Sequence, residues 1–209
     1  VKLISDIDLG CALWTEYEVT LDLNGHVLKM RVSDSVITVK AGGHLTLIDS
    51  TPGAEHKFTP NAEGLWVLDE TAGTKTVNGG IITGGTGNIN RDIVSGGGVY
   101  VKSGGQFTMN GGNIVGCAAR IERVQAQGGG VYVAENGTFT MTGGSITGCM
   151  AIAAQVSAYA MGGGICNEGT TTLSGTAKIR DCRTTHAGNQ LGGGICDTGV
   201  LHISGDVEI

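Results

Sequence analysis

The residues of this sequence with the greatest capacity for chemistry are six cysteines: Cys11, Cys117, Cys149, Cys166, Cys182 and Cys196. None of them forms a CxxC pair, so the spacing typical of zinc ribbons and thioredoxin-like redox sites is missing. Cys182 lies four residues before His186, and these two residue types can form a nucleophile and its base. However, Cys117 and Cys149 occupy positions equivalent to Cys182 and have no histidine nearby. We therefore interpret Cys182 as a packing residue.

Glycine-rich phrases recur as GGGVYV at residues 96–101 and 128–133 and as GGGIC at 162–166 and 192–196. A phosphate-binding P-loop requires the pattern GxxxxGK[ST], which this sequence lacks. A dinucleotide-binding fingerprint places its glycines after a strand and at the start of a helix, whereas these glycines precede a strand pattern. We therefore predict no nucleotide site and no cofactor.

Acidic residues are the other candidates for catalysis. Glycoside hydrolases use two carboxylates about 5–10 Å apart, and polysaccharide lyases often combine a calcium-binding acidic cluster with a basic residue. Asp6, Asp8 and Asp22 alternate with apolar residues, which is typical of outward-facing strand positions. Asn167 and Asp197 occupy equivalent positions, but only one of them is acidic. We predict no catalytic residues and no metal site, and keep a polysaccharide-cleaving enzyme as the alternative.

An internal repeat organises these residues. FTMNGGNIVGC at 107–117 and FTMTGGSITGC at 139–149 match at eight of eleven positions, with an offset of 32 residues. An apolar column follows the repeat with spacings of 24 to 32 residues: Leu23, Leu47, Val77, Met109, Met141, Leu173 and Ile203. Two residues after each member stands glycine, or Asp49 in one copy, which indicates a turn with positive φ. Val99 and Val101 flank Tyr100, and this alternation has the period of a strand.

Three short strands per copy at a period of 30–32 residues predict an all-β fold, a right-handed parallel β-helix formed by a single chain with about seven rungs. A β-sandwich does not need near-identical units, and a propeller blade needs about forty residues and four strands. We expect one domain over residues 1–209, with less regular rungs over 1–60 and regular rungs over 61–209. Because strand patterns run into both ends, we expect further domains of the same parent chain.

The segments ITVKAGGHLTLIDS, GGQFTMNGGNIVGC and GGGIC resemble the β-helical segments of large secreted and cell-surface proteins of gut Firmicutes, which are often adhesin-like. The resemblance covers residues 1–209. It implies an extracellular module, secreted or attached to the cell wall. Its implied role is adhesion to a host protein, such as a secretory or mucosal protein, or to a glycan, or the display of other domains. It implies no catalytic residues, because the matching motifs are structural.

The formal net charge of −6 argues against a nucleic-acid partner. The sequence contains no run of eighteen apolar residues, so we predict no insertion into a membrane. Bulky apolar and arginine residues gather in four variable segments, at 86–95, 118–127, 150–161 and 183–191. We expect these segments to be loops on one side of the coil that bind a partner. The candidate residues are Arg91, Ile93, Arg120, Ile121, Arg123, Val124, Ile152, Val156, Tyr159, Arg183 and His186. Alternatively, the loops pack on each other and cover the edge of the coil.

Tyr100 and Tyr132 occupy one column, which Cys166 and Cys196 continue. The two tyrosines form either a small sugar-stacking strip or an aromatic ladder that stabilises the sheet, and we expect the ladder. Neighbouring rungs would place Cα atoms about 4.8 Å apart, which is within the range of a disulfide. Parallel side chains make the disulfide geometry awkward. We therefore expect mostly free thiols, with Cys166 and Cys196 as the pair best placed for a bridge.

Overall fold

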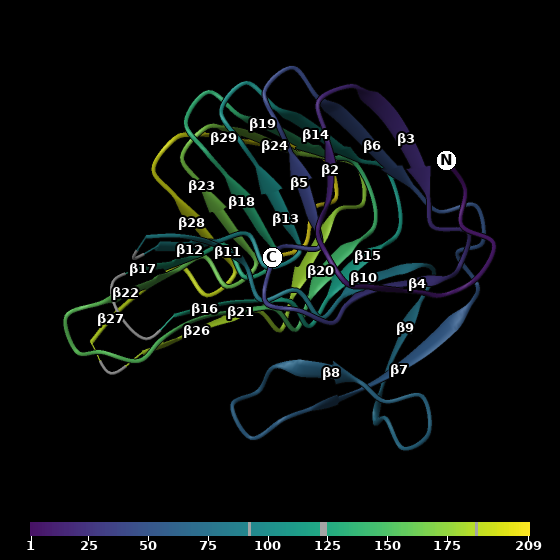
Figure 1. Ribbon diagram of the computed structural model, residues 1–209, viewed down its shortest axis with the longest axis horizontal. Coiled ribbons are helices and arrows are strands. Elements are labelled where there is room, and N and C mark those ends of the chain that lie inside the picture. The colour runs from purple at the N-terminus through teal and green to yellow at the C-terminus, as the bar shows by residue number, and fades with distance from the viewer. Residues whose placement is uncertain (92, 122–124, 187) are drawn as a thin grey trace.

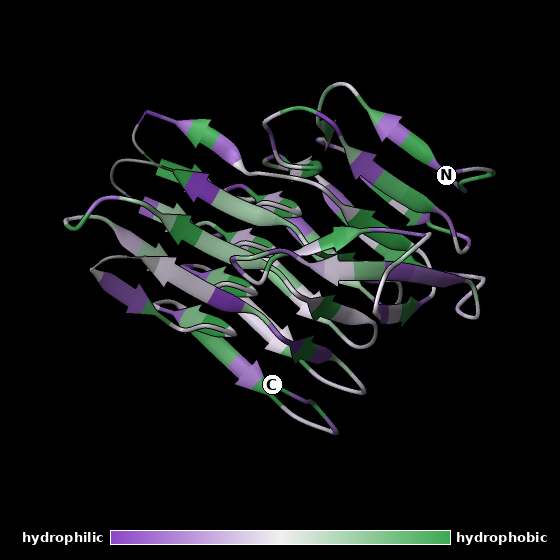
Figure 2. Ribbon diagram, turned by 90° about the horizontal axis from the view of Figure 1, so that it is seen from below, coloured by the Kyte–Doolittle hydropathy of each residue, from purple (hydrophilic) through white to green (hydrophobic). Residues whose placement is uncertain are grey.

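The computed structural model describes residues 1–91, 93–121, 125–186 and 188–209. These residues form short β-strands and no helix, and the strands gather in six sheets (Figure 1). Polar and apolar segments alternate along many of the strands, as the sequence pattern predicts (Figure 2). The protein is therefore all-β.

Three of the sheets are parallel and contain six strands each within the described residues. Sheet 1 contains β1 (Ile7–Leu9), β4 (Val27–Met30), β10 (Ile81–Thr83), β15 (Asn113–Val115), β20 (Ser145–Thr147) and β25 (Lys178–Arg180). Sheet 2 contains β2 (Leu13–Thr15), β5 (Ile37–Val39), β13 (Val99–Val101), β18 (Val131–Val133), β23 (Ile165–Asn167) and β28 (Ile195–Asp197). Sheet 3 contains β3 (Glu18–Asp22), β6 (His44–Ile48), β14 (Gln106–Met109), β19 (Thr138–Met141), β24 (Thr170–Leu173) and β29 (Val200–Ile203). The chain visits the three sheets in turn and pairs each strand with its counterpart one repeat earlier, an arrangement consistent with a β-helix or solenoid.

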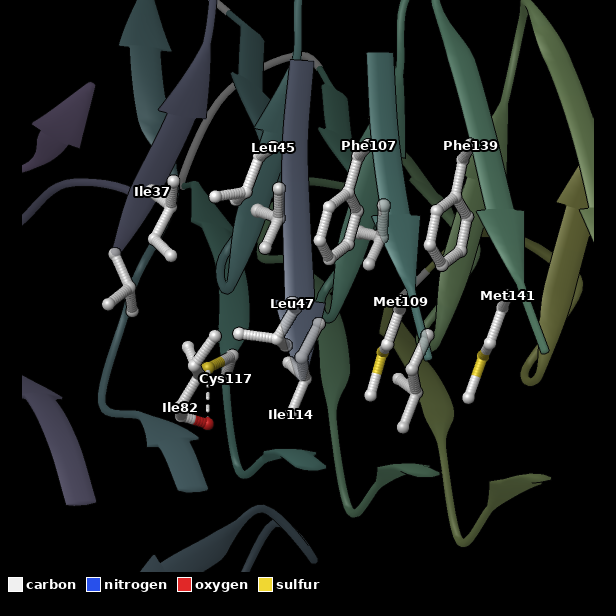
Figure 3. Packing of buried hydrophobic residues seen from close by; sticks show 14 of the residues in the cluster. Ile37, Leu45, Leu47, Ile82, Phe107, Met109, Ile114, Cys117, Phe139 and Met141 are labelled. Carbon is white, nitrogen blue, oxygen red and sulfur yellow. Dashed lines mark hydrogen bonds between the residues drawn. The ribbon is translucent and has the colours of Figure 1, made fainter. Parts of the chain in front are cut away.

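One hydrophobic core lies between these three sheets, and equivalent residues of successive repeats stack on each other within it. Phe107 pairs with Phe139, and their rings stack with centroids 4.9 Å apart and planes 7° from parallel (Figure 3). Met109 pairs in the same way with Met141. The 32-residue offset of the sequence is therefore the distance along the chain between hydrogen-bonded neighbours.

Two members of the predicted apolar column were wrong. Leu21, and not Leu23, pairs with Leu47. Leu23 is also buried, because two positions that differ by two residues lie on the same face of a strand. Val77 lies outside the parallel sheets, and Leu47 pairs directly with Met109. The three sheets thus have six strands each in the described residues, and single bridges between Lys2 and Asp22 and between Lys178 and Glu208 extend the pairing at the two ends.

Val77 belongs to an antiparallel insertion between β6 and β10, which we call the hairpin. It contains β7 (Glu55–Pro60), β8 (Trp66–Leu68) and β9 (Lys75–Asn78), with β7 in the centre. The hairpin projects from the parallel sheets in Figure 1, below sheet 1. It adds residues between two repeats without adding a strand to the three six-stranded sheets, which is why the period of the sequence misplaced Val77.

The four segments predicted as loops form strands instead, and we call the resulting two-layered projection the arm (Figure 1). Sheet 4 contains β16 (Ala118–Ile121), β21 (Met150–Ala153) and β26 (Arg183–His186). Sheet 5 contains β11 (Asn88–Asn90), β12 (Ile93–Ser95), β17 (Gln125–Gln127), β22 (Tyr159–Met161) and β27 (Asn189–Leu191). A core of one valine and six alanines lies in the arm: Val94, Ala119, Ala126, Ala151, Ala153, Ala158 and Ala160. Because alanine contrasts weakly with its polar neighbours, the alternation of these strands was not visible in the sequence.

The GGG phrases are the corners at which the chain passes from sheet 5 into sheet 2. The first glycine of each phrase, at positions 96, 128, 162 and 192, has φ between +59° and +65°. A Cβ atom on any of these glycines would lie 1.9–2.6 Å from the carbonyl oxygen three residues later. Only glycine fits this corner, and every repeat that carries the arm must solve the same steric problem.

We expect Phe139→Ala to lower the free energy of unfolding by about 3–5 kcal/mol, because it leaves a cavity beside the stacked Phe107. Thr140→Ala on the half-buried outer face of the same strand is the matched control, with an expected change of about 0.5 kcal/mol. Urea unfolding followed by circular dichroism measures both values. Equal losses for the two variants would contradict the assignment of the inner face.

Candidate functional site

Three of the predicted partner-binding residues contact the protein's own hairpin. Arg120 forms an ion pair with Glu63, in the loop between β7 and β8. The guanidinium of Arg183 lies against Gly64, where a Cβ atom would be 2.7 Å from Nη1. Ile152 is only 5% exposed and belongs to a small apolar cluster against which Leu65 packs. These contacts hold the hairpin loop on sheet 4.

The other predicted residues that the structure describes are spread over the arm. Tyr159 is 40% exposed and pairs with Gln125 on sheet 5, and Gln125 pairs on its other side with the half-buried Ile93. Val156 is 75% exposed in the turn between β21 and β22, whereas Ile121 packs against the alanine core. Arg91 is exposed and has a φ of +56°. His186 ends β26, and its side chain is outside the described part of the structure. Arg123 and Val124 lie outside the described residues.

The tyrosine column forms the expected ladder. The rings of Tyr100 and Tyr132 lie with centroids 5.3 Å apart and planes tilted by 59°. The hydroxyl of Tyr132 donates a 2.7 Å hydrogen bond to Glu168, which also accepts a 2.7 Å bond from the Gln127 amide of sheet 5. Burial, followed by the hydrogen bond to Glu168, raises the pKa of Tyr132 above its ordinary value. The column therefore ties sheet 2 to the arm and leaves little of Tyr132 accessible to a sugar.

Contacts on both sides of Trp66 position the hairpin over the outer face of sheet 1. The backbone N–H of Trp66 donates to the carbonyl of Gly148, and its ring belongs to a buried cluster with Phe58. The ring of His56 joins the hairpin to the neighbouring turn, with Nδ1 2.8 Å from Glu70 Oε1 and Nε2 2.9 Å from the carbonyl oxygen of Gly25. The hairpin is thus held as a wall beside sheet 1.

A groove of about 590 Å³ lies between this wall and the outer face of sheet 1. Its described lining residues are Trp66, Thr76, Val77, Asn113, Gly144, Ser145, Thr147, Thr176, Lys178, Arg180 and Asp181. The parallel strands supply the floor, and the hairpin supplies the side that carries the indole. A volume of this size is typical of a small-molecule site.

A chain of hydrogen bonds crosses the floor of the groove from strand to strand. Thr147 Oγ1 donates to Ser145 Oγ at 3.2 Å, and Ser145 Oγ donates to Asn113 Oδ1 at 2.7 Å. The Asn113 amide in turn donates to the carbonyl of Asn78, at 2.9 Å, in the hairpin strand β9. The pattern orients the hydroxyl groups and leaves lone pairs on the oxygens of Ser145 and Thr147 for a ligand.

The charges in the groove balance. Lys178 follows Ser145 in register and is half-buried, while Asp181, with φ +53°, is the one carboxylate among the described lining residues. Arg180 forms an ion pair with Glu208, and its hydrogen bond lowers the pKa of the Glu208 carboxyl. The groove offers donors, acceptors and an aromatic edge, which suits a ligand rich in hydroxyl groups.

The residue pattern did not predict this groove. Ser145 and Lys178 were outward-facing positions of the repeat with no distinguishing neighbour. The one available signal was the recurrence of polar residues at Asn113 and Ser145 in successive copies. What makes them a site is the hairpin, whose position over sheet 1 depends on contacts between residues far apart in the sequence.

We expect Gly148→Ala to displace the hairpin, because a Cβ atom would lie 2.2 Å from Cγ of Trp66 and φ is +61°. The strain corresponds to about 1–3 kcal/mol of lost stability, and the emission of Trp66 should shift to the red as its ring meets water. Fluorescence in a Trp14→Phe background isolates Trp66. Gly53→Ala is the control, since a Cβ there would have no atom within 4 Å. Unchanged emission in Gly148→Ala would contradict this packing.

The described residues contain no helix that could cross a membrane, and no group of three His, Cys, Asp or Glu side chains placed to hold a metal ion. Comparisons with family models, with curated proteins and with solved structures found no match to this chain.

Proposed function

We propose that this chain is a right-handed parallel β-helix module of a secreted or cell-wall-attached bacterial protein, and that it binds a glycan without cleaving it. The handedness follows the strong preference of parallel crossover connections. The extracellular context follows the resemblance of its repeats to adhesin-like segments. Adhesion is the role we assign to the binding site.

The groove between the hairpin and sheet 1 is the observation that supports this function. The hydroxyls of Ser145 and Thr147 are oriented by the bond to Asn113 and can accept from sugar hydroxyls. The ammonium of Lys178 supplies donors at the next rung. Trp66 lines the wall of the groove and is 7% exposed, so only the edge of this residue is available to the apolar C–H groups of a pyranose ring. Neutral glycans present this mixture of donors, acceptors and apolar C–H groups.

The distribution of carboxylates favours binding over cleavage. Hydrolysis of a glycosidic bond uses two carboxyl groups, whereas Asp181 is the single carboxylate among the described lining residues. The neighbouring Glu208 is paired with Arg180. Hydrolysis of a glycan in this groove would need a second acid.

A protein partner on the arm is the second candidate function. Apolar side chains are exposed there, with Val156 at the tip and Tyr159 and Leu191 on sheet 5. Aromatic residues among apolar neighbours are typical of protein-binding surfaces. A host secretory or mucosal protein is the partner class that suits an adhesin-like module.

A glycan array followed by calorimetry with the best ligand tests the groove. We expect Ser145→Ala and Lys178→Met each to weaken binding about tenfold, which corresponds to the loss of one hydrogen bond to the ligand. Thr140→Ala on sheet 3 and Lys102→Met are matched controls away from the groove and should bind normally.

Three outcomes would overturn the proposal. Glycan binding that is unaffected by the groove variants would remove the site. Loss of glycan binding in a Val156→Ser, Tyr159→Ala double variant would instead place the binding site on the arm. Release of shortened or unsaturated oligosaccharides during the assay would show the polysaccharide-cleaving activity that we kept as the alternative.

A further inference from the structure

The base of the hairpin is fastened to the parallel sheets by a histidine. His56 lies on β7, pairs with Val77 of β9 and is only 8% exposed. Its ring contacts two other parts of the chain, which are the turn at Gly25, before β4, and Glu70, in the loop that joins β8 to β9. Both β8 and β9 contribute residues to the lining of the groove. The contacts of His56 therefore fix the strands that form the wall of the groove.

Both ring nitrogens of His56 face oxygen atoms that accept hydrogen bonds. Nε2 lies 2.9 Å from the carbonyl oxygen of Gly25, and Nδ1 lies 2.8 Å from Oε1 of Glu70. A backbone carbonyl and an ionised carboxylate have no hydrogen to donate, and a neutral imidazole carries a hydrogen on one nitrogen only. With Glu70 ionised, both contacts are therefore hydrogen bonds only when the ring of His56 is doubly protonated and positively charged.

A second hydrogen bond holds Glu70 against the ring. Its Oε2 accepts from the backbone N–H of Lys57 at 3.1 Å. The side chain of Glu70 is 46% exposed, whereas that of His56 is 10% exposed and the carbonyl of Gly25 is buried. Water can therefore replace the ring as a partner of Glu70, but it cannot easily replace the ring at Gly25.

Other charged groups lie around this contact, in the turn and on β7. Asp49 accepts from the N–H of Gly25 at 2.7 Å, so a second carboxylate lies in the turn. His26 follows Gly25 in the chain, but its Nδ1 lies 3.3 Å from Oδ1 of Asp6 instead. The residues on either side of His56 in β7 are charged and exposed, on the opposite face of the strand: Glu55 and Lys57. The proton on His56 is thus the one that joins the hairpin to the turn.

We propose that His56 and Glu70 form a pH-sensitive latch on the groove, and the role of this latch in glycan binding rests on the function proposed above. A doubly protonated ring holds the Gly25 turn and the Glu70 loop together, and the hairpin is fastened as a wall. When the ring loses one proton, a nitrogen lone pair faces one of the two oxygens and that hydrogen bond is lost. The bond to Glu70 gives way, because a lost bond to the buried carbonyl of Gly25 would leave that carbonyl without a partner.

The loss of this bond is transmitted to the groove through the loop that carries Glu70. This loop begins after β8, which carries Trp66, and ends at β9, which carries Thr76 and Val77, and these three residues line the groove. A histidine gains or loses its second proton between about pH 5 and 8. Because the protonated ring makes the additional hydrogen bond, the wall is fastened at the acidic end of this range and loosens as the pH rises.

The latch is tested by the fluorescence of the Trp14→Phe protein, in which Trp66 is the remaining tryptophan. We expect the emission to shift to the red between about pH 6 and 8, because loss of the proton lets water reach the indole. His56→Gln and Glu70→Gln should each abolish this shift. The first removes the titrating ring, and the second supplies an amide that can accept from the protonated ring or donate to the neutral one. His202→Gln, on the exposed face of β29, is the matched control and should keep the shift.

Nitrogen NMR of the imidazole ring measures its protonation directly. At about pH 6 both ring nitrogens of His56 should carry a hydrogen, and at about pH 8 one of them should have lost it. The signals that disappear in His56→Gln identify this ring among the five histidines of the chain. A ring with a single hydrogen at pH 6 would contradict the latch, because one of the two contacts would then hold no proton.

Three further outcomes would overturn the proposal. The first is emission of Trp66 that stays constant from about pH 6 to 8, and the second is a shift that persists in His56→Gln. The third is a shift that is lost in His26→Gln and kept in His56→Gln, which would assign it to the contact between His26 and Asp6.

Glycan binding at two pH values connects the latch to the groove. For the best ligand from the array, we expect affinity to fall about tenfold from pH 6 to pH 8 and to stay within about twofold in Glu70→Gln. Equal affinity of the unsubstituted protein at the two pH values would overturn control of the site by the latch. Failure of every glycan to bind would refute the proposed function instead, and the emission and NMR measurements, which need no glycan, would still decide whether the latch exists.

Discussion

The structure depends on in-register stacking of equivalent residues along parallel strands. Each backbone pairs with the backbone one repeat away, so a side chain has its own counterpart as neighbour. Phe107 packs on Phe139 and Tyr100 packs on Tyr132, so the packing of a side chain depends on the residue at the same position in the next repeat. A substitution in one repeat therefore changes the surroundings of two others.

The glycine corners of the repeat are invariant in shape, and the inserted segments lie between the core strands. The first glycine of each GGG phrase makes the backbone turn into sheet 2, and no residue with a Cβ atom fits there. The arm and the hairpin enter between core strands, where added residues do not disturb the register. The hairpin then folds back on sheet 1, and Trp66 and the strand floor together enclose the groove. Regular strands thus provide the floor of the site, and an irregular insertion provides its wall.

The two cysteine columns show how position in a rung determines chemistry. Cys149 is fully buried and donates to backbone carbonyls, so its thiol is stabilised in the protonated form. Cys196 instead lies on sheet 2 in register with Cys166 and is partly exposed. The residue type is the same, and the difference arises from the position of each cysteine in the repeat and from its solvent exposure.

By itself, the sequence determined the all-β character, the 32-residue repeat, the strands of the parallel sheets from Val99 onward and the columns of tyrosines and cysteines, because period-2 alternation and equal spacing are local properties. It did not reveal the arm, because the alanine core of the arm contrasts weakly with its polar surroundings. It also did not reveal that Leu47 pairs with Met109, because the inserted hairpin has about the length of one repeat and was counted as one. The groove was decided by tertiary structure alone. It exists because Trp66 packs on Gly148, a contact between residues in different repeats that no spacing predicts.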